Sequence, residues 1–290
     1  MNPEEMWAYA VSKGYDKDCG FSGKTPFRTM GAQIYMDIKN GNNVFYMYSV
    51  NPQKFGLVSL CDSYSKNGNE RAIVEVNSSS FMERDLHPLL VTFINSDEHF
   101  HAHAKTIMHE KSIKSGKNAE KWLHPDIVAV HYSFEDLDKN VVDFATKIGE
   151  SVVTLYSFEL KKSITSDNVR EYYFQAVSNS SWANEGYLVA PKISDDAMKQ
   201  LGRLNASFGI GVIKLDLNDV CQSEIVIPSK WVEVLDLGMI DDLVRINPDF
   251  DEFIANIQKA LKTDEVVDKH YDIVLDSEKL VEYTRKKHIF

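Results

Sequence analysis

The sequence predicts a two-domain protein of the α+β or α/β class, in which a small helical unit with a β-hairpin precedes a mixed sheet with flanking helices. Helical and strand-like segments alternate from residue 80 onward, which is typical of helices packed around one central sheet. Two near-continuous apolar runs, 127–130 and 152–158, predict strands buried on both faces. The first 60 residues instead contain two helical patterns followed by two short strands.

The N-terminal elements follow from local signals. Gly14 ends the first helical pattern, and Thr25 can cap a second helix whose first residue is Pro26. A turn at Asn51-Pro52 separates the two strands. The expected elements are helices at 4–13 and 26–40 and strands at 44–49 and 55–60. Helix, turn, helix and hairpin is the order of a winged helix.

The second half of the sequence predicts a series of alternating helices and strands. Its expected elements are a helix from residue 80 that carries Glu83 and His87, strands at 101–109, 127–133 and 152–160, a helix at 135–148 between the last two, a helix at 169–179, a strand at 186–190, a helix at 195–206, strands at 210–215 and 224–227, and helical residues 235–261 split at Asn247-Pro248. The predicted domains are 1–62, a linker at 63–79, the sheet domain at 80–262, and a helical tail at 263–290.

Composition and charge narrow the class of protein. A hydrophobic content of 43% with 11% aromatics is typical of a folded chain, and no apolar run predicts a membrane-spanning helix. The scattered cysteines Cys19, Cys61 and Cys221 lack C-x-x-C spacing, which argues against a cysteine zinc site and favours the cytoplasm. Residues 1–80 carry no net charge, so the formal charge of −11 falls on 81–290. Metal ions must then neutralise part of the negative charge at any phosphate-binding site in residues 81–290.

Two short motifs stand at the ends of the predicted strands. Pro125-Asp126 precedes one apolar run, and Glu159-Leu160-Lys161 ends the other. Charged groups at the ends of buried strands gather at one edge of a sheet, so we expect the motifs to meet there. Carboxylates bind hard cations and lysine can steady a hydroxide nucleophile, which is the chemistry of a Mg²⁺-dependent phosphodiesterase. The alternative is a salt bridge between strand ends, because such short matches also arise by chance.

The N-terminal segment contains three further motifs: Phe21-Ser22-Gly23-Lys24-Thr25-Pro26, Ala32-Gln33-Ile34-Tyr35-Met36-Asp37-Ile38 and Lys54-Phe55-Gly56-Leu57. They resemble the HARE-type winged helix-turn-helix domain over roughly residues 3–60. Members of that family usually open with an additional helix, and this chain begins where the second would start. The resemblance implies DNA binding. Lys24 and Arg28, near the start of the helix at Pro26, are the expected phosphate contacts.

Glu83, Pro125-Asp126, Glu159-x-Lys161 and Gln175 occur in that order between residues 80 and 230. This order resembles the PD-(D/E)xK restriction-endonuclease-like domain. The resemblance makes Glu83 the helix acid, and Asp126 and Glu159 the metal ligands. Lys161 is then the catalytic lysine, and Gln175 matches a glutamine that a subset of these nucleases carries on the following helix. The combined architecture is similar to that of HrgA-like proteins, which occur near restriction–modification loci.

The resemblance implies a Mg²⁺-dependent endonuclease that acts on double-stranded DNA, with Mn²⁺ as a substitute cofactor and a homodimer as the expected assembly. Asp126 and Glu159 would hold one or two metal ions, with the Leu160 carbonyl as an extra ligand. Glu83 would complete a second metal site, with His87 as its neighbour on the same helix. The alternative, from another class, is a non-catalytic DNA-binding or regulatory protein that retains the nuclease fold as a scaffold.

A loop rich in Lys, Ser and Gly follows the strand expected at 101–109. Its Lys111, Lys114 and Lys117 could form an arm that contacts phosphates beside the active site. A solvated loop without a ligand is equally consistent with this composition.

Three histidines alternate at the start of the same expected strand. His99, His101 and His103 would then share one strand face, where three imidazoles could bind Zn²⁺. A polar face near solvent is the commoner meaning of such a run, and the sequence shows no evident fourth ligand.

Overall fold

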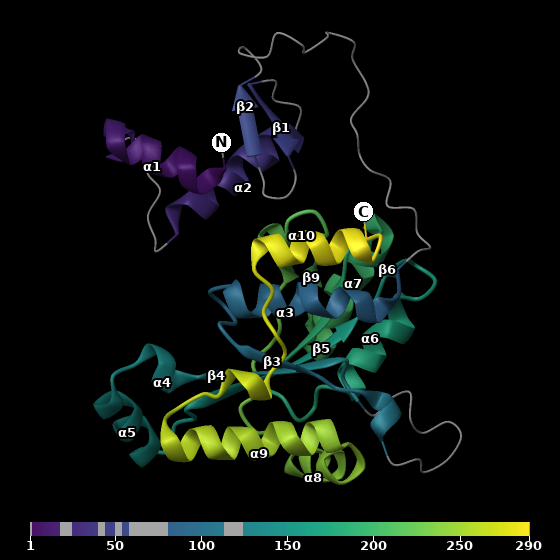
Figure 1. The fold of residues 1–290 in the computed structure, drawn as a ribbon. Helices are drawn as coiled ribbons and strands as arrows, with labels where there is room; N and C mark the ends of the chain where they lie inside the picture. Colours follow the sequence, from purple (N-terminus) through teal and green to yellow (C-terminus); the bar gives the residue numbers. More distant parts are fainter. Residues whose placement is uncertain are drawn as a thin grey trace. The chain divides into compact units, whose positions relative to one another are not determined.

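The computed structural model describes residues 2–17, 25–39, 44–49, 54–57, 81–112 and 124–289 (Figure 1). The chain divides into two compact units. The first comprises Met1–Phe81, Leu217–Gln222 and Asp276–Phe290, and the second comprises Met82–Asp216 and Ser223–Leu275. The linker expected at 63–79 lies outside the described residues.

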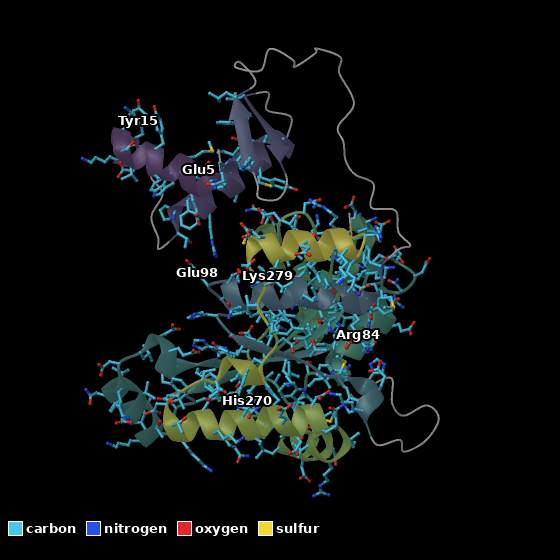
Figure 2. All side chains as sticks on the ribbon, in the orientation of Figure 1. Glu5, Tyr15, Arg84, Glu98, His270 and Lys279 are labelled. Atoms are coloured by element: carbon cyan, nitrogen blue, oxygen red, sulfur yellow. The ribbon has the colours of Figure 1, made fainter. Side chains whose placement is uncertain are left out.

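The first unit contains the two helices and the hairpin that the sequence predicts. These are α1 (Pro3–Lys13), α2 (Pro26–Lys39), β1 (Phe45–Ser49) and β2 (Lys54–Leu57), followed far along the chain by α10 (Ser277–Lys286). At the start of α1 the Asn2 side chain accepts from the Glu5 amide at 2.7 Å. The Glu5 carboxylate (Figure 2) in turn accepts from the Asn2 amide at 3.0 Å. Gly14 ends the helix at φ 76°, a conformation that glycine adopts without steric cost. β1 and β2 pair antiparallel, with Phe45 opposite Leu57.

The second unit is built on a six-stranded mixed sheet in the order β10-β9-β7-β5-β4-β3. β4 pairs antiparallel with both β3 and β5, whereas β5, β7 and β9 run parallel and β10 closes the edge antiparallel to β9. The strands are β3 (His103–Thr106), β4 (Ile127–Tyr132), β5 (Val153–Leu160), β7 (Glu185–Ala190), β9 (Gly211–Lys214) and β10 (Glu224–Ile227), with β6 (Ser163–Ile164) and β8 (Lys192–Ile193) pairing beside them. The mixed α+β class is confirmed.

Helices cover both faces of this sheet. On one face, Val128 and Val130 of β4 pack with Phe250 and Phe253 from α9. The opposite face meets α3, and α3 and α9 lie on opposite sides of the strands in Figure 1. The helices are α3 (His87–Ser96), α4 (Ser133–Asp136), α5 (Lys139–Lys147), α6 (Val169–Ser178), α7 (Asp195–Phe208), α8 (Leu237–Ile246) and α9 (Pro248–Thr263). None of the helices in the described ranges is both long enough and apolar enough to cross a membrane.

Three expected boundaries were wrong. The helix expected from residue 80 is a 3₁₀ turn at Glu83–Leu86 followed by α3, because Pro88 in the first turn has no N–H to extend the helical bonding backward. The helix expected at 135–148 is divided into α4 and α5. Asp138 starts the second of these, where its carboxylate accepts from the Asn140 amide at 2.9 Å. The strand expected at 101–109 covers only His103–Thr106.

Candidate functional site

The pairing of β4 with β5 brings the two carboxylate motifs together. Ile127 lies opposite Phe158, and the Asp126 amide donates to the Phe158 carbonyl at 3.1 Å. Asp126 itself lies in the bend before β4, and its carboxylate accepts from the amide of Leu160, the residue after Glu159, at 2.8 Å. The Asp126 carboxylate also raises the pKa of Glu159, so the two acidic groups lie close together. Lys161, two residues after Glu159, points to the same side of β5 as Glu159.

The Lys161 ammonium connects the acidic groups. Its Nζ lies 2.6 Å from Glu159 Oε1 and 3.3 Å from Glu83 Oε1. Glu83 reaches this point from the 3₁₀ turn before α3, and Lys161 Nζ also lies 5.3 Å from the centre of the Tyr172 ring on α6. The structure therefore gathers Glu83, Asp126, Glu159 and Lys161, which are four of the five catalytic residues that the sequence predicts.

Leu160 contributes through its backbone. Its amide donates to Asp126 Oδ2 at 2.8 Å, which fixes the Asp126 carboxylate beside the end of β5. The bond involves the N–H of Leu160, while the expected metal ligand is its carbonyl. The ligand role of that carbonyl stays a prediction.

Sequence reasoning missed Asn179. This fully buried side chain, at the end of α6, donates from Nδ2 to Glu159 Oε2 and to the His124 carbonyl, both at 2.9 Å. Gln175 lies one turn earlier, and Tyr172, Gln175 and Asn179 form one helical stripe at spacings of three and four residues. The contacts with Lys161 and Glu159 come from Tyr172 and Asn179, the two ends of that stripe. The four-residue spacing between Gln175 and Asn179 was the signal in the sequence that could have identified Asn179.

The charged groups shift one another's pKa values. Burial raises the pKa of the Glu159 carboxyl, and the Asp126 carboxylate adds to the rise while Lys161 opposes it. Burial also raises the pKa of Glu83. Burial lowers the pKa of the Lys161 ammonium, but attraction by Glu159, Asp126 and Glu83 outweighs it, so this pKa lies above its usual value. Lys161 is therefore cationic, and its single positive charge offsets only part of the negative charge that the three acidic groups can carry.

The donor set fits a hard divalent cation. Asp126, Glu159 and Glu83 offer carboxylate oxygens, the ligands that Mg²⁺ and Mn²⁺ accept. Each oxygen of Glu159 already accepts one hydrogen bond and retains a further lone pair. Asn179 Oδ1 adds a buried oxygen that has no hydrogen-bond partner among the described residues. These residues could hold Mg²⁺ once Lys161 moves off the carboxylates.

The expected DNA-contacting residues fall into two groups. Lys24, Lys114 and Lys117 lie outside the described residues. Arg28 lies in the first turn of α2 and is half-buried. Lys111 ends a 3₁₀ turn, and its Nζ forms a 2.6 Å ion pair with Asp249 at the start of α9. The contact with Asp249 ties Lys111 to the sheet domain, so this lysine has a structural partner that the sequence did not reveal.

The prediction that the three alternating histidines share one face was wrong. His101 adopts φ 37°, which is not extended backbone, so the alternation stops there. His99 Nε2 lies 2.9 Å from Glu185, and His103 Nε2 lies 3.0 Å from Glu135. His101 instead approaches Asp136.

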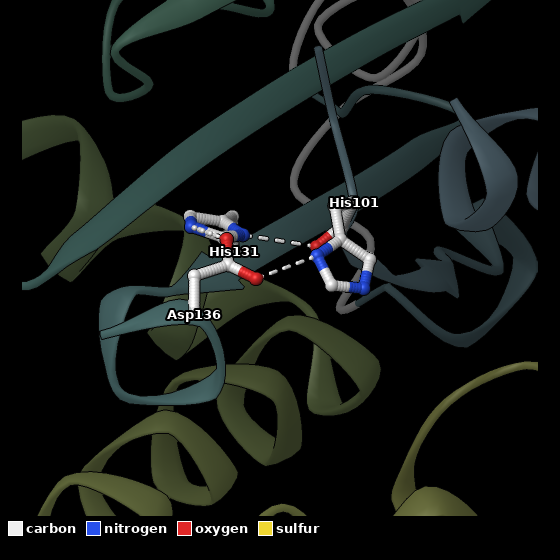
Figure 3. Close-up of side chains that lie close together, drawn as sticks. All are labelled: His101, His131 and Asp136. Atoms are coloured by element: carbon white, nitrogen blue, oxygen red, sulfur yellow. Dashed lines mark hydrogen bonds and ion pairs between the residues drawn. The ribbon is translucent and has the colours of Figure 1, made fainter. Parts of the chain in front are cut away.

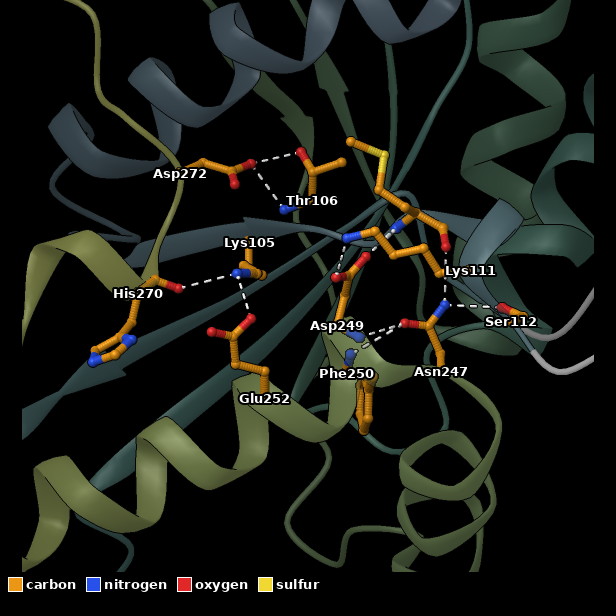
Figure 4. Close-up of polar contacts among 11 residues, drawn as sticks. Lys105, Thr106, Lys111, Ser112, Asn247, Asp249, Phe250, Glu252, His270 and Asp272 are labelled. Carbon is orange, nitrogen blue, oxygen red and sulfur yellow. Dashed lines mark hydrogen bonds and ion pairs between the residues drawn. The ribbon is translucent and has the colours of Figure 1, made fainter.

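A polar framework of hydrogen bonds joins the start of α9 to the segment after β3 (Figure 4). Asn247, which is fully buried, caps α9 by accepting from the Asp249 and Phe250 amides. Its Nδ2 donates to the Met108 carbonyl and to Ser112 Oγ, and Ser112 Oγ contacts His124 Nε2 at 3.1 Å. Hydrogen bonds thus connect the start of α9 with His124, the residue that precedes Pro125-Asp126.

Replacing Asn247 with alanine is expected to cost about 2–4 kcal/mol, because it removes a helix cap and leaves buried polar groups unsatisfied. Urea denaturation measures this change. Asp236→Ala at the exposed cap of α8 is the control and should cost only about 1 kcal/mol. Equal losses in the two variants would contradict the framework role.

The environment of His87 predicts that the stability of the protein depends on pH. Thr106 Oγ1 donates to Asp272 at 2.6 Å, so His87 Nδ1, 3.3 Å from the same oxygen, is the donor in that contact. Burial lowers the pKa of His87 below its usual value, although Asp126 and Asp272 attract the charged form and Arg84 and Lys161 repel it. The unfolded chain therefore takes up a proton below about pH 6.5, before the folded one does.

Stability is thus present above about pH 6.5 and falls as the pH approaches the lower, folded-state pKa of His87. Urea midpoints at about pH 7.5 and pH 5.5 should drop more in the wild type than in His87→Gln. Parallel pH profiles of the two proteins would exclude His87 as the source.

Comparison with known proteins gives no relative. No family model, curated protein or solved structure matched this chain.

Proposed function

We propose that this protein is a Mg²⁺-dependent DNA endonuclease with a restriction-endonuclease-like catalytic domain. The observation that carries the proposal is the gathering of Asp126, Glu159 and Lys161 at the ends of two adjacent buried strands, where the Leu160 amide donates to Asp126 Oδ2 at 2.8 Å and Lys161 Nζ lies 2.6 Å from Glu159 Oε1. The half-buried Glu83 and the buried Asn179 complete this cluster. The order helix acid, aspartate strand, E-x-K strand and following helix supports the PD-(D/E)xK assignment.

The residues have separate roles in the proposed reaction. Asp126, Glu159, Glu83 and the Leu160 carbonyl would hold Mg²⁺, which when bound supplies Lewis-acid stabilisation of the phosphoryl charge. Lys161 has a raised pKa, so we assign it as an ammonium that orients the attacking water and stabilises the developing negative charge. Asn179 keeps the Glu159 carboxylate in place through its amide.

We infer that the N-terminal unit tethers the enzyme to DNA. Two helices followed by an antiparallel hairpin support a HARE-type winged helix. Arg28, in the first turn of α2, is then a phosphate contact, together with Lys24. The negative charge of residues 81–290 makes a separate DNA-binding unit useful, because an acidic domain repels the DNA backbone.

A plasmid-nicking assay tests the proposal. The full chain is incubated with methylated and unmethylated supercoiled plasmid in Mg²⁺, in Mn²⁺ and in a chelator. Cleavage is expected with either metal and none with the chelator. Asp126→Asn should abolish it, whereas Asp241→Asn, which removes an exposed partner of Arg245, should not.

A second candidate is a non-catalytic DNA-binding or regulatory protein that keeps the nuclease fold as a scaffold. The observation that favours it is the closed pairing of Lys161 with Glu159 and Glu83, which a purely structural ion-pair cluster would also show. DNA binding in a gel-shift assay, without nicking of any plasmid by the wild type, would establish this second candidate over the first.

A further inference from the structure

A second polar cluster lies away from the acidic site, where β3 begins and β4 ends. It consists of His101, His131 and Asp136 (Figure 3). One ligand atom from each residue lies within 4.8 Å of the others. Two imidazoles and one carboxylate are a common ligand set for transition metals such as Zn²⁺, and a poor one for Mg²⁺.

The hydrogen bonding of His131 prepares it as a ligand. Its Nδ1 lies 3.0 Å from the His101 carbonyl, which can only accept, so Nδ1 carries a proton. In the neutral ring the lone pair then belongs to Nε2, the atom that lies 3.5 Å from Asp136 Oδ2. A backbone carbonyl that fixes the free nitrogen of a histidine is the usual support of a metal-bound imidazole.

When the His131 ring is neutral, this arrangement places two electron-pair donors face to face. An ionised Asp136 only accepts hydrogen bonds, and Nε2 of neutral His131 also accepts. A cation between them removes the conflict. His101 Nδ1, 3.2 Å from Asp136 Oδ1, supplies the third donor atom on the same side (Figure 3).

The backbone of His101 holds both of its functional groups in place. Its φ of 37° is uncommon for a residue with a side chain. The His101 amide donates to the Asp97 carbonyl at 2.9 Å, and the Ala102 amide donates to the Ile94 carbonyl at 3.3 Å, so the turn is bonded on both sides. One residue can thereby orient His131 through its carbonyl and offer its own ring to the same point.

We propose that His101, His131 and Asp136 bind one Zn²⁺-type transition-metal ion, separate from the acidic site around Glu159. The bound ion joins the segment before β3, the end of β4 and α4. The side chains of His101 and Asp136 are 55% and 46% exposed, so water can reach the remaining coordination position. Glu135, the neighbour of Asp136, is held by His103 and stays outside the ligand set.

Metal binding to the tag-free full chain tests the proposal. The protein is stripped with a chelator and titrated with Zn²⁺ by calorimetry and with Co²⁺ by visible absorption, in excess Mg²⁺ to saturate oxygen-rich sites. One ion per chain is expected in the wild type. Asp136→Asn and His131→Gln should each weaken binding by roughly tenfold or more. Asp136 is exposed, so its variant remains informative if His131→Gln fails to fold.

Two controls locate the ion. His103→Gln removes a neighbouring histidine that pairs with Glu135, and Asp126→Asn alters the acidic site. Both should bind Zn²⁺ as the wild type does. No stoichiometric Zn²⁺ binding, equal affinity in Asp136→Asn and the wild type, or binding lost only in Asp126→Asn would each overturn the proposal. The Asp126 arm also separates this site from the proposed nuclease site.

Discussion

Replacing Lys161 with alanine is expected to lower the free energy of unfolding by about 3–5 kcal/mol, the usual cost of breaking a buried ion pair from one side. Lys161 is 9% exposed and Glu159 is 1% exposed, so water cannot replace the ammonium beside the carboxylate. Plasmid nicking should fall by roughly 10²–10³-fold or more, because the charge that orients the nucleophile is lost. Urea denaturation and the nicking rate measure the two effects separately.

A double variant separates packing from charge. In Lys161→Ala with Glu159→Gln the buried carboxylate is gone, and the Asn179 amide can still donate to the new side-chain oxygen. Part of the lost stability should return, while the nicking rate should stay at least as low as in Lys161→Ala. Lys199→Ala, which breaks an exposed 3.1 Å pair with Asp196, is the matched control and should change stability by less than about 1 kcal/mol. Wild-type nicking by Lys161→Ala would remove Lys161 from the proposed mechanism.

The acidic site could be predicted from the sequence because strand geometry is regular. Glu159 and Lys161 share a face through the two-residue repeat, and buried apolar runs fixed β4 and β5 almost to the residue. The antiparallel pairing of β4 with β5, which brings Asp126 to the end of β5, came only with the structure. The sequence motif names the chemical groups, and the sheet register brings them together.

Other parts depended on contacts that no local pattern reveals. Asn179 binds Glu159 across 20 positions of sequence, and Lys111 meets Asp249 across 138. His101 leaves the strand through a positive φ, which places it with His131 and Asp136 instead of with His99 and His103. Alternation predicts a shared face only where the backbone stays extended, so one residue with a positive φ was enough to redirect the cluster.

Asp126→Asn is expected to act in opposite directions on stability and on function. The Asp126 carboxylate raises the pKa of Glu159, so charging both groups raises the free energy of the metal-free folded state. Asparagine keeps an oxygen that can accept the Leu160 amide but carries no charge. The metal-free variant should gain roughly 0.5–2 kcal/mol over the wild type, as happens when a strained functional site is relieved.

Adding a metal ion should make the wild type more stable than Asp126→Asn. In the wild type, Mn²⁺ at about 100-fold excess over its Kd adds about 2.7 kcal/mol of stability, whereas Asp126→Asn lacks a ligand and should show little increase. Thermal melts with and without Mn²⁺ measure both quantities, and Asp241→Asn on the exposed pair with Arg245 controls for the loss of one negative charge.

A metal-free Asp126→Asn that melts below the wild type would show that Asp126 serves mainly to stabilise the sheet edge. An unchanged Mn²⁺ shift would show that the ion binds elsewhere. Only the combination of a higher metal-free melting temperature and a lost metal response fits carboxylates that are held together at a cost in order to bind a cation.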